Sequence, residues 1–339
     1  MRWQNLTVES EREATLPGFK EPAVVRTFDA PEALGIRFYE VRARSAINEV
    51  PKRSRMPFRY TINPYRGCSH ACTYCFARPT HTYLDFNARE DFERQIVVKV
   101  NVPELVRTEL ARPSWKGEHV ALGTNTDPYQ WVEGRYELMP GIWEAMRDFS
   151  NPCSVLTKSP LLLRDLELMR ELAERTEFTA NLSIPTLDEK AWRATEPHTP
   201  HPRKRIEAVA ELKRAGIRTG VLIAPLIPGV NDSPDQVEPL LDLLEEAGAD
   251  SVGGVALHLR GEVRDIWFDW LRERRPDLLP RYEELYERGA YVPRAEADRL
   301  SAMVRRGDRG GPSREFRQRA EPPTEDDLSP PPGRQPRLF

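Results

Sequence analysis

Short apolar runs alternate with amphipathic stretches along most of the chain between residues 59 and 259. The apolar runs have the length of β-strands, and polar or turn-forming residues follow each of them. We therefore predict six principal strands, near Tyr60–Asn63, His119–Gly123, Cys153–Thr157, Phe178–Ser183, Arg218–Ala224 and Ser251–His258.

Amphipathic patterns of helical period separate these strands, most clearly at Pro160–Arg175, Pro202–Ala215 and Pro234–Ala247. The last two end in Ala-Gly, a common helix stop, and a strand follows closely each time. A further strand, Gln95–Val100, and a helix, Pro103–Leu110, lie between the first two principal strands. Such alternation indicates βαβ units and a parallel sheet. We predict an α/β fold, a partial (β/α)6 TIM-type barrel, with a doubly wound open sheet as the alternative.

The flanking segments differ in pattern from this core, which we place at residues 57–262. Residues 1–56 are expected to form an irregular N-terminal extension with two strand-like stretches, Ala23–Phe28 and Ile36–Arg42. Residues 263–306 carry helical patterns. Residues 307–339 are almost devoid of apolar side chains, so we expect them to form a disordered tail.

Composition and charge limit the partners and the cellular location that we expect for the protein. Among 339 residues, 39% are hydrophobic and the formal net charge is −3, so no global positive field draws the protein to nucleic acid or anionic lipid. The N-terminus is charged where a signal peptide needs an apolar core, and no apolar run of about 18 residues occurs. We expect a cytoplasmic protein without a membrane partner.

Three of the four cysteines, Cys68, Cys72 and Cys75, lie within eight positions just after the first predicted strand. Thiolates are soft ligands that suit zinc or an iron–sulfur cluster. A structural zinc usually takes four protein ligands, and the fourth cysteine, Cys153, opens a strand at the opposite end of the barrel. We favour an iron–sulfur cluster. The alternatives are a zinc site and buried structural cysteines, because the i, i+4, i+7 spacing also fits one helix face.

Polar residues follow several predicted strands at their carboxyl ends, as in Thr124-Asn-Thr-Asp127, Thr157-Lys-Ser159, Asn181 and Ser183, and His258. In a parallel barrel these ends share one rim, where active sites are assembled. Asp127 and Glu133 could be an acid/base pair or loop caps. His258 and Arg260 are candidate substrate contacts.

A loop rich in proline precedes the helix that is predicted to begin at Pro202. His198 and His201 in this loop could bind a metal, although the prolines favour a rigid loop. The basic triplet Arg203, Lys204 and Arg205 could bind an anion.

The CxxxCxxC spacing, with an aromatic residue before the third cysteine, resembles the signature of the radical S-adenosylmethionine (SAM) superfamily. Further segments between about Arg59 and Arg260 are similar to a branch that includes spore photoproduct lyase and proteins labelled "DNA repair photolyase". They are Thr126-Asp-Pro-Tyr-Gln130, Leu156-Thr-Lys-Ser-Pro160, Ser183-Ile-Pro-Thr-Leu-Asp188, Glu196-Pro-His-Thr-Pro-His201 and Ala224-Pro-Leu-Ile-Pro-Gly229.

This resemblance implies a [4Fe-4S] cluster on Cys68, Cys72 and Cys75, with SAM on the fourth iron. It implies that Thr126 lies near the methionyl amino group, that Lys158 pairs with the carboxylate, and that Ser183 contacts the methionyl or ribose end. Backbone at Tyr74 and Ala224 would flank the adenine. The reduced cluster would cleave SAM to a 5′-deoxyadenosyl radical that abstracts hydrogen from a substrate, with a flavodoxin- or ferredoxin-type electron donor.

The resemblance leaves the substrate open. A nucleic-acid lyase or repair enzyme is the first hypothesis, and modification of a peptide, RNA or small metabolite is the second. An iron–sulfur protein that only transfers electrons is the third. The chain departs from spore photoproduct lyase where that family has a hydrogen-donating cysteine and a tyrosine, because Thr124 and Phe76 stand at those positions.

Overall fold

The computed structural model describes residues 8–15, 22–31, 33–51, 54 and 56–305. Its larger sheet has the strand order β12-β11-β10-β9-β8-β5-β4. Only β4 (Ile47–Glu49) is antiparallel to its neighbour, and the other pairings are all parallel. The parallel strands are β5 (Tyr60–Ile62), β8 (Val120–Leu122), β9 (Cys153–Thr157), β10 (Phe178–Ser183), β11 (Arg218–Leu226) and β12 (Ser251–Ala256). These are the six strands predicted from the apolar runs.

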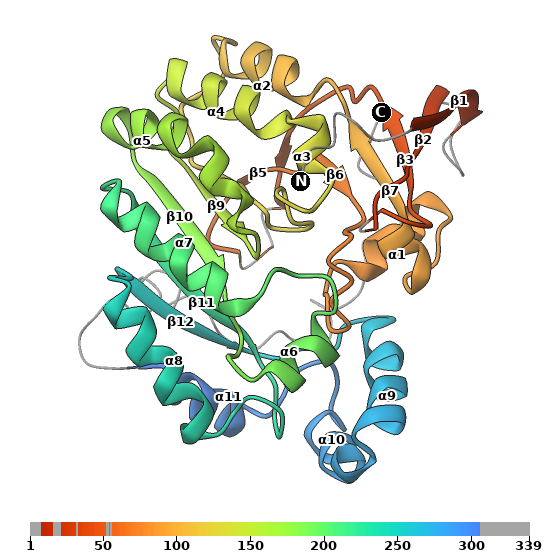
Figure 1. Ribbon diagram of the computed structural model, residues 1–339, viewed down its shortest axis with the longest axis vertical. Helices are drawn as coiled ribbons and strands as arrows, with labels where there is room; N and C mark the ends of the chain where they lie inside the picture. Colours follow the sequence, from red (N-terminus) through yellow and green to blue (C-terminus); the bar gives the residue numbers. More distant parts are fainter. Residues whose placement is uncertain (1–7, 16–21, 32, 52–53, 55, 306–339) are drawn as a thin grey trace.

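The strand order decides between the two architectures that the sequence left open. Each parallel strand pairs with the next one along the chain, without the reversal that a doubly wound sheet requires. Right-handed crossovers then place all the connecting helices on one face. Figure 1 shows α4, α5, α7 and α8 side by side on the outer face of a curved sheet. The fold is the α/β arrangement of a partial barrel, as predicted.

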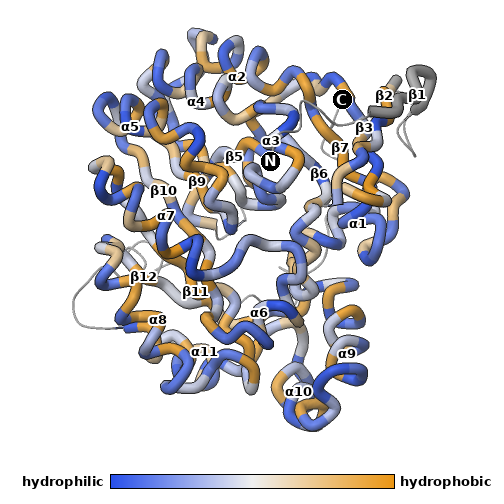
Figure 2. Tube along the Cα trace, in the orientation of Figure 1, coloured by the Kyte–Doolittle hydropathy of each residue, from blue (hydrophilic) through white to orange (hydrophobic). Residues whose placement is uncertain are grey.

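Five helices make up much of the outer layer: α2 (Val102–Leu110), α4 (Leu138–Asp148), α5 (Leu166–Arg175), α7 (Pro202–Arg214) and α8 (Pro234–Glu246). Their apolar faces pack on the sheet, where Trp143, Leu172 and Leu212 are fully buried. Each such side chain contributes about 1.5–3 kcal/mol through burial. Figure 2 shows the resulting alternation of apolar and polar residues along α5 and α8. This packing holds the carboxyl ends of the strands in fixed relative positions.

A second sheet has the order β1-β2-β3-β7-β6. It joins β1 (Val8–Thr15), β2 (Pro22–Phe28) and β3 (Arg37–Val41) to β7 (Gln95–Lys99) and β6 (Tyr65–Arg66). The N-terminal segment is therefore more regular than expected, since both of its strand-like stretches are strands. Local pattern could not show this sheet, because the two-residue β6 is a strand only through its long-range partner β7. The sheet places the cysteine segment immediately after β6.

Three further helices follow the sheet where helical patterns were predicted: α9 (Val263–Arg274), α10 (Leu279–Leu285) and α11 (Arg294–Met303). Trp267, Tyr282 and Tyr286 form an apolar cluster with Cys72 and Tyr74, so the C-terminal helices pack directly against the cysteine segment. None of the described helices is both long and apolar enough to cross a membrane. The tail from Gly307, expected to be disordered, lies outside the described residues.

The shorter elements that complete the fold are α1 (Glu90–Arg94), α3 (Glu133–Tyr136), α6 (Glu189–Thr195) and the 3-10 helices η2 (Arg78–Leu84), η3 (Pro160–Asp165) and η4 (Pro276–Leu278). The pair Gly253-Gly254 permits close packing at β12. A Cβ atom on Gly254 would lie 2.8 Å from the Leu226 and Val304 side chains.

Candidate functional site

The three clustered cysteines lie on a loop of turns between β6 and η2. Backbone N–H groups of Ala71 and Cys75 donate to the carbonyl oxygens of Cys68 and Cys72, each at 3.2 Å, and Ala71 has a positive φ of 54°. A continuous helix does not allow this conformation. The alternative in which the cysteines occupy one face of a buried helix is therefore wrong.

Two buried side chains hold this cysteine loop from outside. Arg78 donates to the carbonyl oxygens of Ala71 and Cys72 at 3.1 and 3.0 Å and pairs with Glu93. Gln130 accepts from Ser69 N–H at 2.9 Å and donates to Gly67 O at 3.1 Å. These bonds satisfy backbone groups that an irregular buried loop would otherwise leave unpaired. Arg78 was not singled out from the sequence, and Gln130 was quoted in a segment but received no role, because both act from outside the cysteine motif.

The donor set fits an iron–sulfur cluster. Cys68, Cys72 and Cys75 are free thiols, and each lies close enough to another of the three to interact with it electrostatically. Among the residues that the structure describes, no three His, Cys, Asp or Glu side chains converge on one position suited to a single ion. A four-iron cube does not need such convergence, because each thiolate binds a different iron atom. Burial raises the pKa of Cys75 to about 11 and also raises that of Cys72.

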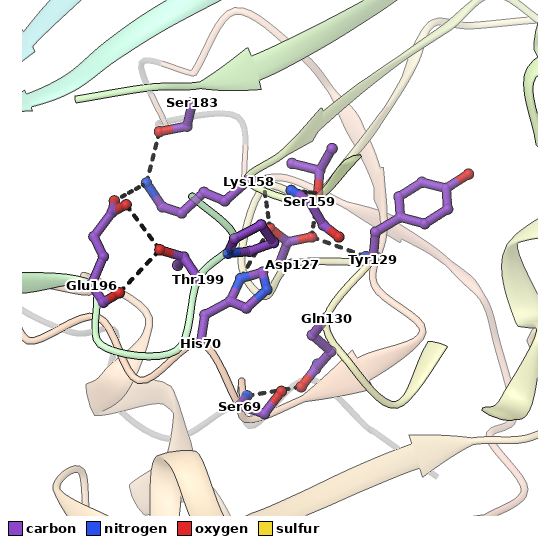
Figure 3. A network of polar contacts seen from close by, with 12 residues as sticks. Ser69, His70, Asp127, Tyr129, Gln130, Lys158, Ser159, Ser183, Glu196 and Thr199 are labelled. Atoms are coloured by element: carbon purple, nitrogen blue, oxygen red, sulfur yellow. Dashed lines mark hydrogen bonds and ion pairs between the residues drawn. The ribbon is translucent and has the colours of Figure 1, made fainter. Parts of the chain in front are cut away.

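Lys158, which follows β9, lies at the centre of a second group of polar side chains. Its Nζ is 2.7 Å from Glu196 Oε1, 2.7 Å from Ser183 Oγ and 3.2 Å from the Tyr74 hydroxyl. Ser183 in turn donates to the carbonyl oxygen of Ala224 at 3.1 Å. Figure 3 shows Lys158 extended between Ser183 and Glu196. The structure thus brings together four of the five predicted SAM contacts, Tyr74, Lys158, Ser183 and Ala224.

Glu196 was quoted in a motif but received no role from the sequence. Its side chain is 2% exposed and pairs with Lys158 and with fully buried Arg205, both at 2.7 Å. Burial alone would raise its pKa, but the positive charges of Arg205 and Lys158 hold the pKa of Glu196 far below its ordinary value. One carboxylate therefore faces two cations. The group keeps a net positive charge, and Lys158 is its most exposed member.

The basic triplet and its neighbouring histidines do not form one site. Arg205 forms a buried ion pair with Glu196, and Lys204 pairs with Glu207 at 2.6 Å on the surface. His201 accepts from Arg203 N–H at 3.2 Å as the N-cap of α7, and its ring packs against Trp192. The rigid-loop interpretation of this segment fits these contacts better than a metal site does.

Among the described residues, no hydrogen bond joins Thr126 directly to Lys158, Ser183 or Glu196. Its hydroxyl donates to the carbonyl oxygen of Tyr65 in β6 at 2.9 Å, and the residue is 2% exposed. The side chain therefore ties the end of β8 to the strand that leads into the cysteine loop.

Asp127 and Glu133, considered together as an acid/base pair, have separate partners. Asp127 accepts from Thr157 Oγ1 at 2.6 Å and from the N–H groups of Lys158 and Tyr129 at 2.7 and 2.9 Å. Glu133 accepts from Met139 N–H at 3.0 Å and from Arg164 at 2.7 Å. These contacts are those of loop caps.

An aromatic row extends from the cysteine loop. The ring of His258 lies 5.9 Å from that of Phe76 and 5.7 Å from that of Tyr291, and both partners are at least 40% exposed. His258 is thus beside the loop, as a substrate contact requires. Burial lowers the pKa of His258, and the positive charge of Arg260 lowers it further, which places Arg260 near the same ring.

Comparison with known proteins identifies a protein family and several relatives. Residues 62–244 match the family model described as the radical SAM superfamily. An uncharacterised protein of Mycobacterium tuberculosis is 46% identical over 308 residues, which cover 90% of this chain and 91% of that protein. The radical SAM Nalpha-GlyT isomerase of Pseudomonas phage M6 is 25% identical over 205 residues, which cover 59% of this chain and 40% of that protein.

Solved structures show the same fold. Spore photoproduct lyase complexed with dinucleoside spore photoproduct superposes with a TM-score of 0.57 at 16% identity, over 79% of this chain and 77% of that one. A mutant of the lyase with bound AdoMet and the same dinucleoside has a TM-score of 0.57 over 86% of this chain and 82% of that one. With the family model matching more than half of its residues, this chain belongs to the radical SAM superfamily.

Proposed function

We propose that this protein is a radical SAM enzyme that holds a [4Fe-4S] cluster on Cys68, Cys72 and Cys75 and binds SAM beside it through Lys158. The net positive charge of the group formed by Lys158, Glu196 and Arg205 is the observation that carries this proposal. Two cations, one of them fully buried, around one buried carboxylate are costly unless a further anion balances the charge. Lys158 is the more exposed of the two cations and also contacts Tyr74 of the cysteine loop, so the anion would bind at its ammonium group.

The carboxylate of SAM is such an anion. A charge-assisted bond from the Lys158 ammonium would hold the carboxylate at the methionyl end of SAM. Ser183 lies close enough to Lys158 to orient the ammonium group. Tyr74 extends from the cysteine loop to the same ammonium group. Side chains that bind SAM are thereby tied to the loop that would hold the cluster. This link fixes their relative positions.

The bound cluster and SAM would together supply reductive cleavage of the sulfonium and a 5′-deoxyadenosyl radical for hydrogen abstraction. The protein contributes orientation and exclusion of water, because Cys68, Cys72, Ser183 and Glu196 are all less than 10% exposed. The electron would come from a flavodoxin- or ferredoxin-type donor.

A substrate in the nucleic-acid class is the first candidate. It is supported by the likeness to spore photoproduct lyase, whose structure holds a dinucleoside photoproduct, although at 16% identity that likeness shows the fold alone. The exposed rings of Phe76 and Tyr291 beside the cysteine loop offer faces on which a base could stack. A protein that only transfers electrons would not need the cationic group around Lys158.

The direct test is an anaerobic assay. Protein reconstituted with iron and sulfide is incubated with SAM and dithionite, and 5′-deoxyadenosine is measured by liquid chromatography. We expect its formation to depend on the cluster and to rise when a true substrate is added. Reconstituted protein that carries four irons per chain but forms no 5′-deoxyadenosine with reductant would refute the proposal.

A further inference from the structure

The carboxylate of Asp127 connects the cysteine loop to the Lys158 strand end. One oxygen, Oδ2, accepts from Lys158 N–H at 2.7 Å and lies 3.3 Å from His70 Nδ1. The other, Oδ1, accepts from Thr157 Oγ1 at 2.6 Å and from Tyr129 N–H at 2.9 Å. Figure 3 shows His70 and Lys158 on either side of this carboxylate. Asp127 therefore joins the loop after β5 and β6, the loop after β8 and the end of β9.

His70 is placed between this carboxylate and a cysteine. It lies two residues from both Cys68 and Cys72, and its side chain is 2% exposed. Its ring interacts electrostatically with the Cys68 thiol as well as with Asp127. Its Nδ1 has no well-aligned hydrogen bond in the described part of the chain, and its nearest approach to Asp127 is the 3.3 Å contact with Oδ2. Nothing in the proposed function so far uses this buried imidazole.

We propose that Asp127 is a positioning residue that holds His70 beside Cys68, where His70 raises the reduction potential of the cluster. The same carboxylate links the orientation of His70 to the backbone of Lys158, the proposed SAM-binding lysine. The inference rests on the proposed function, because it requires a cluster on Cys68. A hydrogen-bond donor or a positive edge near a ligating sulfur favours the reduced cluster, which carries one more negative charge. Asp127 keeps His70 in that orientation while it also fixes the backbone of Lys158.

The test uses the full-length protein, reconstituted anaerobically. Two variants, Asp127→Asn and His70→Gln, change the pair with little change in volume. Glu133→Gln is the matched control, because Glu133 is also a buried carboxylate that accepts backbone N–H groups but belongs to the Arg164 group. The readouts are iron content, the midpoint potential from a redox titration followed by electron paramagnetic resonance, and SAM affinity in the absence of turnover.

We expect the midpoint potential to fall in Asp127→Asn and in His70→Gln, with about four irons retained, and to stay unchanged in Glu133→Gln. The midpoint potential of the double variant should shift no more than that of the more affected single variant, since both substitutions remove the same interaction. SAM affinity should fall about fivefold in Asp127→Asn, which loses one backbone hydrogen bond to Lys158, and should be retained in His70→Gln.

Wild-type potentials in both single variants would overturn the inference, even if SAM affinity changed. If Asp127→Asn does not retain iron, His70→Gln decides the question by the same criterion. Failure of the proposed function would look different, because the wild-type protein itself would then lack the cluster or the cleavage of SAM.

Discussion

At the scale of single residues, Lys158 has the most specific expected role. Lys158→Ala removes a charge-assisted contact worth roughly 1.5–3 kcal/mol, so SAM binding should weaken about tenfold or more. Iron content should not change, since Lys158 would not touch the iron. Isothermal titration of reconstituted protein measures the effect, and Lys204→Ala is the control, because that exposed lysine pairs with Glu207 on the surface. Equal SAM affinity in the two variants would assign Lys158 to structure alone.

Three other residues determine a second expectation, on the substrate. Returning hydrogen to a product radical needs a weak X–H bond such as a thiol, and Thr124 carries a much stronger hydroxyl bond. Cys153 cannot replace it, because it is 1% exposed and begins β9, at the end remote from the cysteine loop. Phe76 supplies a ring without a hydroxyl. We expect no efficient repair of spore photoproduct, and rapid multiple-turnover conversion of the lesion to thymines in an anaerobic assay would contradict this.

Glu196 gives a prediction on pH. The cationic partners that lower its pKa stabilise the folded state fully above the unfolded pKa of about 4.3, and this contribution is lost as the pH falls further. Glu196→Gln should cost about 3–5 kcal/mol at pH 7, since it leaves fully buried Arg205 without its carboxylate partner and beside the Lys158 ammonium. The difference in unfolding free energy between wild type and variant should shrink below about pH 4.3. Urea titrations of apo-protein at several pH values would measure it, and a constant difference would disprove the linkage.

At the scale of elements, the cysteine loop is the unit to test. Reconstituted wild-type protein should be brown and carry about four irons per chain, as a [4Fe-4S] cube requires. Replacing Cys68, Cys72 and Cys75 together by Ala should abolish iron binding, which colorimetric iron analysis would measure. Cys153→Ala is the matched control and should retain the iron, because Cys153 is buried at the far end of β9. Full iron content in the triple variant would refute the cluster assignment.

At the scale of the whole molecule, the chain end separates into two parts. A protein that ends at residue 306 should cleave SAM normally, because residues 307–339 contain too few apolar side chains to bury a core. A protein that ends at residue 293 should be destabilised, because it loses α11, whose Leu300 is fully buried, and Val304, which packs against Gly254 of β12. Thermal unfolding and 5′-deoxyadenosine formation would measure both. Loss of SAM cleavage in the longer, folded truncation would contradict the prediction.

The sequence by itself determined the six parallel strands, most of the helices on their outer face and the cysteine motif. Each of these depends on local periodicity or on spacing within a few residues, and such signals are complete within a short segment. It also predicted that Lys158 and Ser183 lie near each other, because parallel strands bring their carboxyl ends to one rim. Their group still lacked its central carboxylate, since Glu196 lies in a loop where one glutamate resembles any other.

Tertiary structure alone decided the strand order, the second sheet and the partners of the buried charges. Strand pairing such as β6 with β7 joins residues about 30 positions apart, and no periodic pattern records it. Likewise, Arg205 looks in the sequence like part of a surface triplet, yet it is fully buried against Glu196. Asp127 and His70 are 57 positions apart and meet only when the strand ends converge. Long-range electrostatic pairs of this kind depend on three-dimensional position, because a charge in the sequence does not specify which opposite charge it will face.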